Sequence, residues 1–266
     1  MNWRKNCWNY LIYMEDIRKD LRYDTFYIGF HNRYFIFSPI YPRSYCGMDY
    51  WEIYRKAKDY SSLRIVQGAF KLILWITGVK VTVIGEENIP DEPVLFIGNH
   101  RSFFDILLPY SRCKRLTGYV AKKEMLKFPL LRDWMKNLYC LFLDRENAKE
   151  GLKTILTAID YVKQGISICI FPEGTRNKGE ELSMLPFKDG ALKIATKTGC
   201  PVIPISMNNT SEIFENHFPK IRKTHVVLEY GKPIDYKSLD REDQKHFGAY
   251  CQNIIQETIK KNAALL

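Results

Sequence analysis

Two side chains that can transfer protons, His100 and Asp105, stand five residues apart in the stretch FIGNHRSFFD. Five residues of α-helix rotate by about 500°, or roughly 140° net, so on one regular helix the two side chains would point apart. They can meet only if His100 precedes the helix. Ser102, followed three residues later by Asp105, forms a capping-box pattern, which predicts Ser102 at the N-cap and His100 in the preceding loop. The pair could be a general base and its partner, or Asp105 could only cap the helix.

A second candidate site is the segment FPEGTR, Phe171 to Arg176, which follows the apolar run ISICIF. It combines a proline, an acid, a glycine, a hydroxyl and an arginine in one loop. The planar guanidinium of Arg176 suits a phosphate, and backbone N–H groups around Gly174 can add donors. The alternative interpretation is a turn with a solvated arginine.

Lysines follow another apolar run. Lys122 and Lys123 come directly after GYVA, and two adjacent lysines are usually a solvated surface pair. At the carboxyl end of a strand, however, one of them could hold a phosphate or neutralise an oxyanion. Lys188, in PFKDG before a predicted helix, is a weaker candidate of the same kind.

These candidates must be positioned by the strands and helices around them. Seven short runs rich in Val, Ile, Leu or aromatic residues predict strands at Lys80–Ile84, Val94–Ile97, Gly118–Ala121, Leu138–Leu143, Ile166–Phe171, Pro201–Ser206 and His225–Tyr230. Four longer segments predict helices at about Phe103–Cys113, Ala148–Gln164, Gly190–Thr198 and Glu242–Ala264. The alternation predicts a single α/β domain, a mixed sheet flanked by helices, over residues 79–266. In such sheets ligands gather beyond the carboxyl ends of the strands, where the candidate residues fall.

The first 78 residues differ from the rest. Residues 1–47 are rich in aromatic side chains without a sustained period, so they are either a poorly ordered extension or precede a true start at Met48. Residues 48–78 predict helix, with one narrow polar stripe on an otherwise apolar surface at Arg64, Gln67, Gly68, Lys71 and Trp75. Because the uninterrupted apolar run is far shorter than the ~20 residues of a membrane span, the helix either packs in the core or lies in a membrane interface.

Charge and cysteine content narrow the class of protein. Lys and Arg outnumber Asp and Glu by 40 to 30, which indicates an anionic partner. No long basic block or nucleic-acid signature is present, so a membrane surface or a phosphorylated small molecule is favoured over nucleic acid. Seven cysteines without a C-x-x-C pair predict neither a disulfide framework nor a zinc site. Without a secretory signal pattern, we expect the protein on the cytoplasmic side.

Together the motifs resemble the 1-acyl-glycerol-3-phosphate acyltransferase family, whose members acylate lysophosphatidic acid. NHRSFFD is similar to the family's Asn-His-x4-Asp block, AKKEMLKFP to its second block, FPEGTR to its third and CPVIPIS to its fourth. The order and spacing match as well, and the resemblance covers roughly residues 65–235. Leu130 and Leu131 stand where the family often has Phe-Gly after the proline of the second block, from which we expect an effect on acyl-chain selection.

The resemblance implies a role for each candidate residue. His100 would be the general base and Asp105 would orient it, with no serine or cysteine nucleophile, no metal and no cofactor. The implied binding residues for glycerol phosphate are Glu173, Gly174, Thr175 and Arg176, with Lys122 or Lys123 assisting there or at the oxyanion. The acyl donor would be acyl-CoA or acyl-carrier protein, the acceptor lysophosphatidic acid and the product phosphatidic acid.

The resemblance also favours the interfacial interpretation of residues 48–78, because family members act on lipids at a bilayer surface through N-terminal helices. It implies a peripheral or monotopic protein on the cytoplasmic face of the cell membrane. Two alternatives remain. One is the same chemistry on glycerol-3-phosphate or another lysolipid, and the other is a non-catalytic lipid-binding protein, which would not need His100 beside Asp105.

Overall fold

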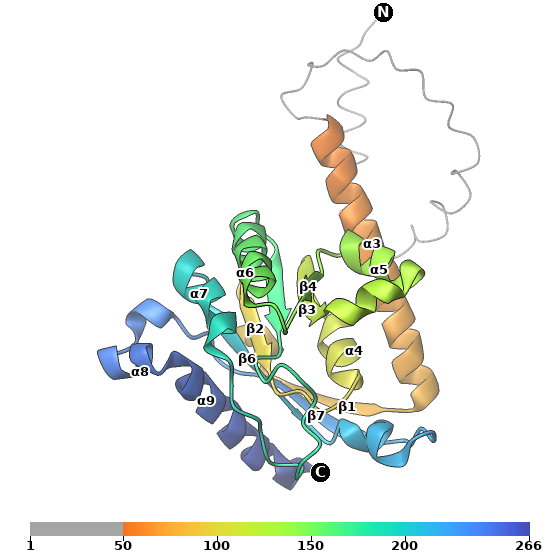
Figure 1. Ribbon diagram of the computed structural model, residues 1–266. Helices are drawn as coiled ribbons and strands as arrows, with labels where there is room; N and C mark the ends of the chain where they lie inside the picture. The colour runs from red at the N-terminus through yellow and green to blue at the C-terminus, as the bar shows by residue number, and fades with distance from the viewer. Residues whose placement is uncertain (1–49) are drawn as a thin grey trace, which may run out of the picture. The chain divides into compact units, whose positions relative to one another are not determined.

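The computed structural model describes residues 50–266, except for the side chains of residues 50–54 and 189. The chain divides into two units, Met1–Ser61 and Ser62–Leu266. The second unit contains the α/β domain (Figure 1). The predictions for residues 1–47, including a start at Met48, lie outside the described residues.

A seven-stranded mixed sheet forms the centre of the second unit, in the order β1-β7-β6-β2-β5-β3-β4. All neighbouring strands are parallel except β6 and β7. The strands are β1 (Lys80–Ile84), β2 (Leu95–Gly98), β3 (Thr117–Lys122), β4 (Leu141–Leu143), β5 (Ser167–Ile170), β6 (Val202–Asn208) and β7 (His225–Tyr230). The predicted mixed sheet is confirmed. The strand expected from Leu138 begins only at Leu141, because Tyr139 has a φ of 59°, which a strand cannot accommodate.

Helices cover both faces of the sheet (Figure 1). The α-helices of the described residues are α3 (Tyr50–Thr77), α4 (Phe104–Tyr110), α5 (Pro129–Asn137), α6 (Ala148–Lys163), α7 (Lys193–Thr198), α8 (Arg241–Lys245) and α9 (Phe247–Asn262). Side chains alternate across β2, so that Leu95 and Ile97 join the core cluster of α6, α7 and α9. Phe96 points the other way and joins the cluster that contains Leu63 of α3 and Leu107 of α4.

Two helical features differ from the sequence-based expectation. The helix predicted from Glu242 is divided into α8 and α9 at His246. The nine-residue helix α5 was not predicted, although it begins with Pro129 at a first-turn position, where a proline costs no hydrogen bond. Between residues 50 and 266, no helix combines the length and the hydropathy that crossing a bilayer requires.

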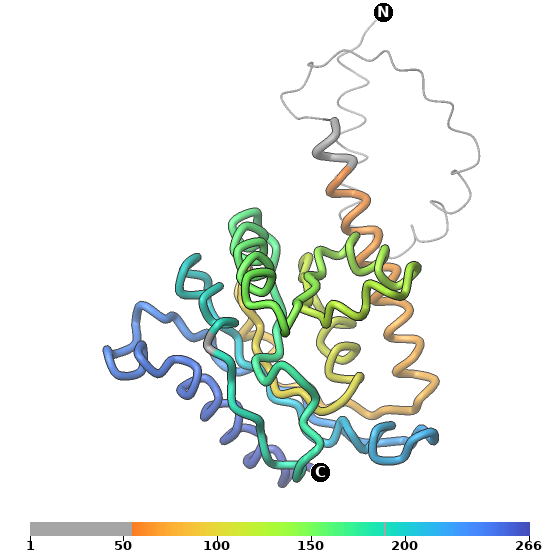
Figure 2. The backbone as a smooth tube through the Cα atoms, viewed as in Figure 1, coloured from red at the N-terminus to blue at the C-terminus, as the bar shows by residue number. Residues whose placement is uncertain are grey.

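The loops that carry the two main motifs leave the same edge of the sheet. β2 and β5 are parallel neighbours, with Ile97 paired to Ile170, so both strands end at this edge. Figure 2 traces the chain from β5 through the FPEGTR loop to the short helix η3 (Asp189–Leu192) and α7. The topology therefore brings His100 and FPEGTR together although about 70 residues separate them in the sequence.

Candidate active site

The candidate active site lies at the carboxyl end of β2, where the chain turns into α4. Nδ1 of His100 lies 2.9 Å from Oδ2 of Asp105. The side chain of His100 is 16% exposed and that of Asp105 is fully buried. His100 lies in the loop before α4 and Asp105 in the first turn of the helix, so the two side chains meet as their spacing requires.

Both carboxylate oxygens of Asp105 accept hydrogen bonds. Besides His100, Oδ2 accepts the backbone N–H groups of Arg101 at 2.6 Å and Ser102 at 2.7 Å. Oδ1 accepts the hydroxyl of Thr210 at 2.6 Å. A carboxylate held by this many donors is fixed in orientation, and it favours the tautomer of His100 that carries its proton on Nδ1.

The N-cap residue of α4 is Phe103, so the prediction of Ser102 at the N-cap is wrong by one residue. Oγ of Ser102 accepts the N–H of Phe104 at 3.0 Å, while Asp105 accepts the N–H of Ser102 in return. A complete capping box would need the N–H of Asp105 to donate to Oγ of Ser102, whereas that N–H donates to the carbonyl oxygen of Ser102 at 3.3 Å. Asp105 therefore accepts the N–H groups that precede α4 and also the imidazole of His100, so one carboxylate serves both the helix start and the histidine.

The FPEGTR loop holds His100 from the neighbouring strand. The imidazole stacks on Phe171, with ring centroids 4.4 Å apart and an angle of 14° between the rings. Oε1 of Glu173 accepts the backbone N–H of His100 at 2.7 Å, and the His100 carbonyl accepts the N–H of Asn177 at 2.7 Å. Nε2 of His100 makes no hydrogen bond to any described residue, which leaves it able to accept a proton.

Glu173 is buried, and both oxygens of its carboxylate accept hydrogen bonds from backbone N–H groups. Oε1 accepts the N–H of His100, and Oε2 accepts the N–H of Leu185 at 2.9 Å. Burial raises the pKa of this carboxyl group, and the hydrogen bonds from the two amides act in the opposite direction. Glu173 thereby ties the loop that follows FPEGTR to the backbone of His100.

The other members of FPEGTR lie nearer the surface. Gly174 has a φ of 75°, and Nζ of Lys188 lies 3.1 Å from the position that a Cβ would occupy there. Thr175 and Arg176 are exposed. Nη1 of Arg176 lies 3.1 Å from Oε1 of Glu215. The loop therefore gathers two cations, Arg176 and Lys188, beside the segment that contacts His100.

Lys122 and Lys123 lie at the end of β3, and each side chain is more than half exposed. Nζ of Lys123 lies 2.8 Å from Asp144, and Nζ of Lys122 lies 3.8 Å from Glu124. Neither ammonium group contacts the His100–Asp105 pair. Of the lysines indicated by the sequence, Lys188 is the one that lies against FPEGTR.

Together these groups provide an imidazole that can take up a proton and a basic loop that suits a phosphate. Among the side chains that the structure describes, no three His, Cys, Asp or Glu residues come together in an arrangement that could hold a metal ion.

Residues 80–208 match the family model described as Acyltransferase. A probable 1-acyl-sn-glycerol-3-phosphate acyltransferase from Mycoplasma genitalium is 31% identical, over 69% of this chain and 72% of its own length. The 1-acyl-sn-glycerol-3-phosphate acyltransferase from Haemophilus influenzae is 30% identical, over 76% of this chain and 83% of its own length. The chain belongs to this acyltransferase family. The resemblance drawn from the four motifs is confirmed.

This acyltransferase is also similar to a yeast protein and to a protein of known structure. The 1-acyl-sn-glycerol-3-phosphate acyltransferase of Saccharomyces cerevisiae is 30% identical over 69% of this chain, but the match spans only 61% of the yeast protein. The crystal structure of the 1-acyl-sn-glycerophosphate (LPA) acyltransferase PlsC from Thermotoga maritima has a TM-score of 0.66 and 26% identity, covering 78% of this chain and 82% of that one. The α/β fold is therefore shared.

Asn99 of the acyltransferase positions His100 in a way that the sequence did not reveal. Its side chain is buried, donating from Nδ2 to the carbonyl of Met207 at 2.8 Å and accepting the Met207 N–H at 2.9 Å. This pairing continues the contact between β2 and β6 past the last residue of β2. The residue before His100 is thereby fixed to a second strand.

Glu215 is a second residue that sequence reasoning missed. It lies in the short helix η5 (Glu215–His217), and its carboxylate accepts the hydroxyl of Ser102 at 2.6 Å and the N–H of Phe103 at 2.7 Å. The same carboxylate pairs with Arg176. Glu215 thus links the acyltransferase's basic loop to the start of α4, and no motif around it signals this role.

Replacing Glu173 with glutamine should lower turnover without weakening acceptor binding. A glutamine has one carbonyl oxygen in place of two carboxylate oxygens, so the amide of either His100 or Leu185 loses its acceptor, at a cost of about 1–3 kcal/mol. We expect a lower melting temperature and a lower kcat with little change in the KM for the acceptor, measured by thermal unfolding and steady-state kinetics.

The matched control for that variant is Glu180→Gln, which changes an exposed carboxylate in the same loop. We expect its melting temperature and kcat to equal those of the unchanged protein. A Glu173→Gln variant that raised the KM for the acceptor at constant kcat would instead make Glu173 a substrate-binding residue.

Proposed function

We propose that this acyltransferase moves a fatty acyl group from acyl-CoA or acyl-carrier protein to the 2-hydroxyl of 1-acyl-sn-glycerol-3-phosphate, forming phosphatidic acid. Membership of the family supports the reaction and the acceptor. The observation that carries the mechanism is the hydrogen bond from His100 to the buried carboxylate of Asp105, with Nε2 of His100 left free.

His100 is the general base of the proposed reaction. Nε2 takes the proton of the acceptor hydroxyl as its oxygen attacks the thioester carbonyl, and Asp105 stabilises the imidazolium that results. When the tetrahedral intermediate collapses, the C–S bond breaks and the proton on Nε2 passes to the leaving thiolate. One ester and one free thiol are formed, and no cofactor is consumed.

The state of Ser102 and of two buried cysteines favours direct acyl transfer over an acyl-enzyme intermediate. The hydroxyl of Ser102 donates to Glu215 and accepts from the Phe104 amide, so it is committed to two partners other than His100. Burial raises the pKa of Cys140 to about 11, and burial also raises the pKa of Cys169, which lowers the fraction of reactive thiolate in both.

Arg176 is the proposed phosphate-binding residue, with Gly174, Thr175 and Lys188 around the same group. The side chain of Arg176 is 48% exposed, and its guanidinium carries donors beyond the Nη1 that pairs with Glu215. Lys122 or Lys123 could reach the oxyanion or the donor only after leaving its present carboxylate partner. Glu173 contributes by positioning His100, because both of its oxygens are occupied.

Contact with a membrane surface is part of the proposal. α3 exposes Leu72, Trp75 and Ile76, of which Trp75 is 78% exposed. Large exposed apolar side chains on one helix are typical of interfacial association, and the excess of basic residues favours an anionic surface. We propose a peripheral or monotopic location on the cytoplasmic face of the cell membrane, with residues 48–78 as the attaching segment.

A panel of acceptors tests this function. Purified protein is supplied with acyl-CoA or acyl-carrier protein and with lysophosphatidic acid, glycerol-3-phosphate or lysophosphatidylcholine, and free thiol release is measured. We expect the fastest release with lysophosphatidic acid. Faster release with lysophosphatidylcholine, which has no phosphate monoester, would assign another acceptor, and no release with any pair would contradict the enzyme function.

Arg176→Gln should raise the KM for lysophosphatidic acid by roughly 10- to 100-fold, because a charge-assisted hydrogen bond to the phosphate contributes about 1.5–3 kcal/mol. The control is Lys178→Gln, which removes one positive charge from an exposed position two residues away. We expect little change in that variant. An equal rise in KM for both variants would mean that the loop acts only through its overall charge.

A further inference from the structure

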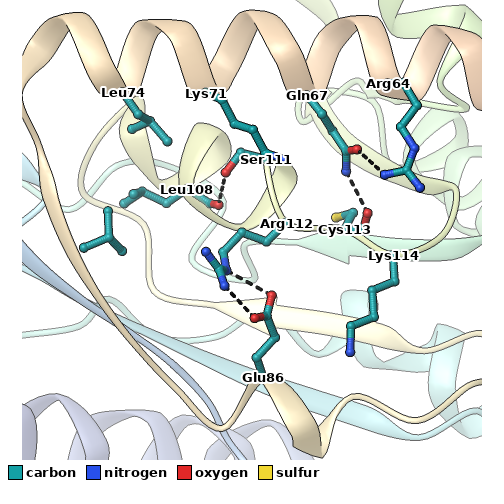
Figure 3. Close-up of a pocket in the computed structure, with 11 residues that line it drawn as sticks. Arg64, Gln67, Lys71, Leu74, Glu86, Leu108, Ser111, Arg112, Cys113 and Lys114 are labelled. Carbon is teal, nitrogen blue, oxygen red and sulfur yellow. Dashed lines mark hydrogen bonds and ion pairs between the residues drawn. The ribbon is translucent and has the colours of Figure 1, made fainter. Parts of the chain in front are cut away.

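A cavity of about 450 Å³ lies at the C-terminal end of α4, between α3 and the residues that follow α4, whereas the candidate active site lies at the N-terminal end of α4. Figure 3 shows Arg64 and Lys71 of α3 on one side of it and Arg112 and Lys114 on the other. α4 begins beside His100 and runs for seven residues, or roughly 10 Å, before this segment starts. None of the residues that hold the His100–Asp105 pair lines the cavity.

The cavity is strongly basic. Four cationic side chains and one carboxylate line it, which leaves an excess of three positive charges. The carboxylate, Glu86, is already bound by both Nε and Nη2 of Arg112, at 2.9 and 2.5 Å. Lys71 and Lys114 have no ion-pair partner among the residues that the structure describes. Their ammonium groups are therefore available to an anion.

The oxygen atoms around the cavity that could accept hydrogen bonds from these cations already accept hydrogen bonds from other groups. The buried side chain of Gln67 donates from Nε2 to the carbonyl oxygens of Tyr110 and Cys113, at 3.2 and 2.7 Å. Oε1 of Gln67 accepts from Nη1 of Arg64 at 3.0 Å. The Ser111 hydroxyl donates to the Leu108 carbonyl at 2.9 Å. The polar groups that remain open to the cavity are mainly cationic donors, which suit phosphate oxygens.

The rim of the cavity continues into the exposed apolar face of α3. At 100° per residue, Lys71 and Arg64 lie on one flank of the helix, and Leu72, Ile65 and Ile76 lie roughly 80–120° further round. These three apolar side chains are exposed, and so is Trp75 between the two groups. If the apolar face enters a bilayer, the basic flank comes to the level of the phospholipid phosphates.

We propose that this cavity binds the phosphodiester headgroup of an anionic phospholipid in the bilayer, separately from the acceptor at His100. The inference rests on the proposed membrane-surface function and deepens it, since it names the lipid chemistry that the surface recognises. A volume of about 450 Å³ lies within the ordinary range for ligand pockets. The guanidinium of Arg64 donates from Nη1 to Gln67, and its Nε and Nη2 remain as a fork that matches a phosphate.

Vesicle binding by the full chain tests the proposal. Phosphatidylcholine vesicles with and without phosphatidylglycerol are sedimented with the protein and with Lys71→Gln/Lys114→Gln. We expect the double variant to bind phosphatidylglycerol vesicles at least roughly tenfold more weakly. The control Lys149→Gln/Lys163→Gln removes two exposed charges from α6 and should bind like the unchanged protein. An equal loss of vesicle binding in the two double variants would overturn the proposal, because it would mean that the overall positive charge of the protein attracts the vesicles.

Arg64→Lys separates recognition of a headgroup from simple attraction, because it keeps the charge and removes the fork. We expect weaker binding to phosphatidylglycerol vesicles in this variant, and wild-type binding would contradict a headgroup site. Release of the wild-type protein from vesicles by inorganic phosphate, but not by chloride at equal ionic strength, would assign the cavity to free phosphate instead. A raised KM for acyl-CoA in Lys71→Gln/Lys114→Gln, with unchanged vesicle binding, would assign it to the donor.

The vesicle experiment is independent of turnover, so the two proposals can fail separately. On short-chain lysophosphatidic acid below its micelle concentration and without vesicles, Lys71→Gln/Lys114→Gln should release thiol at the wild-type rate. Loss of that rate would place the two lysines in the catalytic reaction and contradict a separate site. Absence of thiol release by the wild-type protein would instead contradict the proposed function. The sedimentation experiment would still test whether the cavity binds an anionic headgroup.

Discussion

Replacing His100 with glutamine should lower kcat by roughly three orders of magnitude, the range expected when a general base is removed. A glutamine amide can still donate to Asp105, so the loop before α4 keeps the hydrogen bond that His100 makes there. It cannot take up the proton of the acceptor hydroxyl. Steady-state thiol release with lysophosphatidic acid and acyl-CoA measures the effect, and the KM values should change little.

The control for this variant is His246→Gln, which alters an exposed histidine at the start of α9. Its kcat should equal that of the unchanged protein. Circular dichroism and the melting temperature of both variants establish that they are folded. A folded His100→Gln variant with undiminished kcat would refute the assignment of His100 as the base.

Asp105→Asn should lower kcat by roughly 100-fold while the protein stays folded. Three donors converge on Oδ2, and only the Thr210 hydroxyl faces Oδ1. An asparagine can therefore keep its oxygen towards the three donors and turn its NH₂ group to the Thr210 hydroxyl, which can also accept. What it loses is the negative charge that stabilises the imidazolium, and a charge-assisted bond of this kind contributes about 1.5–3 kcal/mol.

Asp105→Ala provides the contrast, because it leaves the buried N–H groups of Arg101 and Ser102 without an acceptor, at about 1–3 kcal/mol each. We expect its melting temperature to fall far below that of Asp105→Asn. The surface control is Asp160→Asn on α6, which should change neither quantity. If Asp105→Asn kept full activity, the carboxylate would serve only as a helix cap.

Local patterns were sufficient to predict the elements that hold the site. Each parallel strand is a short apolar run ended by a polar turn, so β1 and β7 were predicted with their observed bounds. The capping-box pattern predicted the N-cap one residue too early, at Ser102 instead of Phe103, but it correctly implied that His100 lies before the helix, because the pattern depends on residues only three apart. The FPEGTR turn was also identifiable, because its signal lies within six consecutive residues.

Contacts between distant segments could not be predicted in this way. Glu173 was expected to bind substrate, yet its two oxygens are taken by amides, a fact that depends on how the loop after β5 folds back to Leu185. Asn99 pairs with Met207 and Glu215 reaches Ser102, each across about 110 residues. Hydrogen bonds of this kind leave no periodicity in the sequence, because one polar residue in a loop can satisfy them.

In the proposed mechanism the acyl group passes directly to an alcohol that His100 deprotonates, with Asp105 holding the imidazole. A single-turnover reaction with an acyl donor labelled in its acyl group, quenched at intervals and analysed for labelled lipid and labelled protein, tests it most directly. We predict that label passes from the donor to lysophosphatidic acid without appearing on the protein, and that His100→Gln leaves it on the donor. Labelled protein that forms and decays at the rate of turnover would contradict direct transfer, and product formation by His100→Gln at the wild-type rate would contradict the role of His100 as the base.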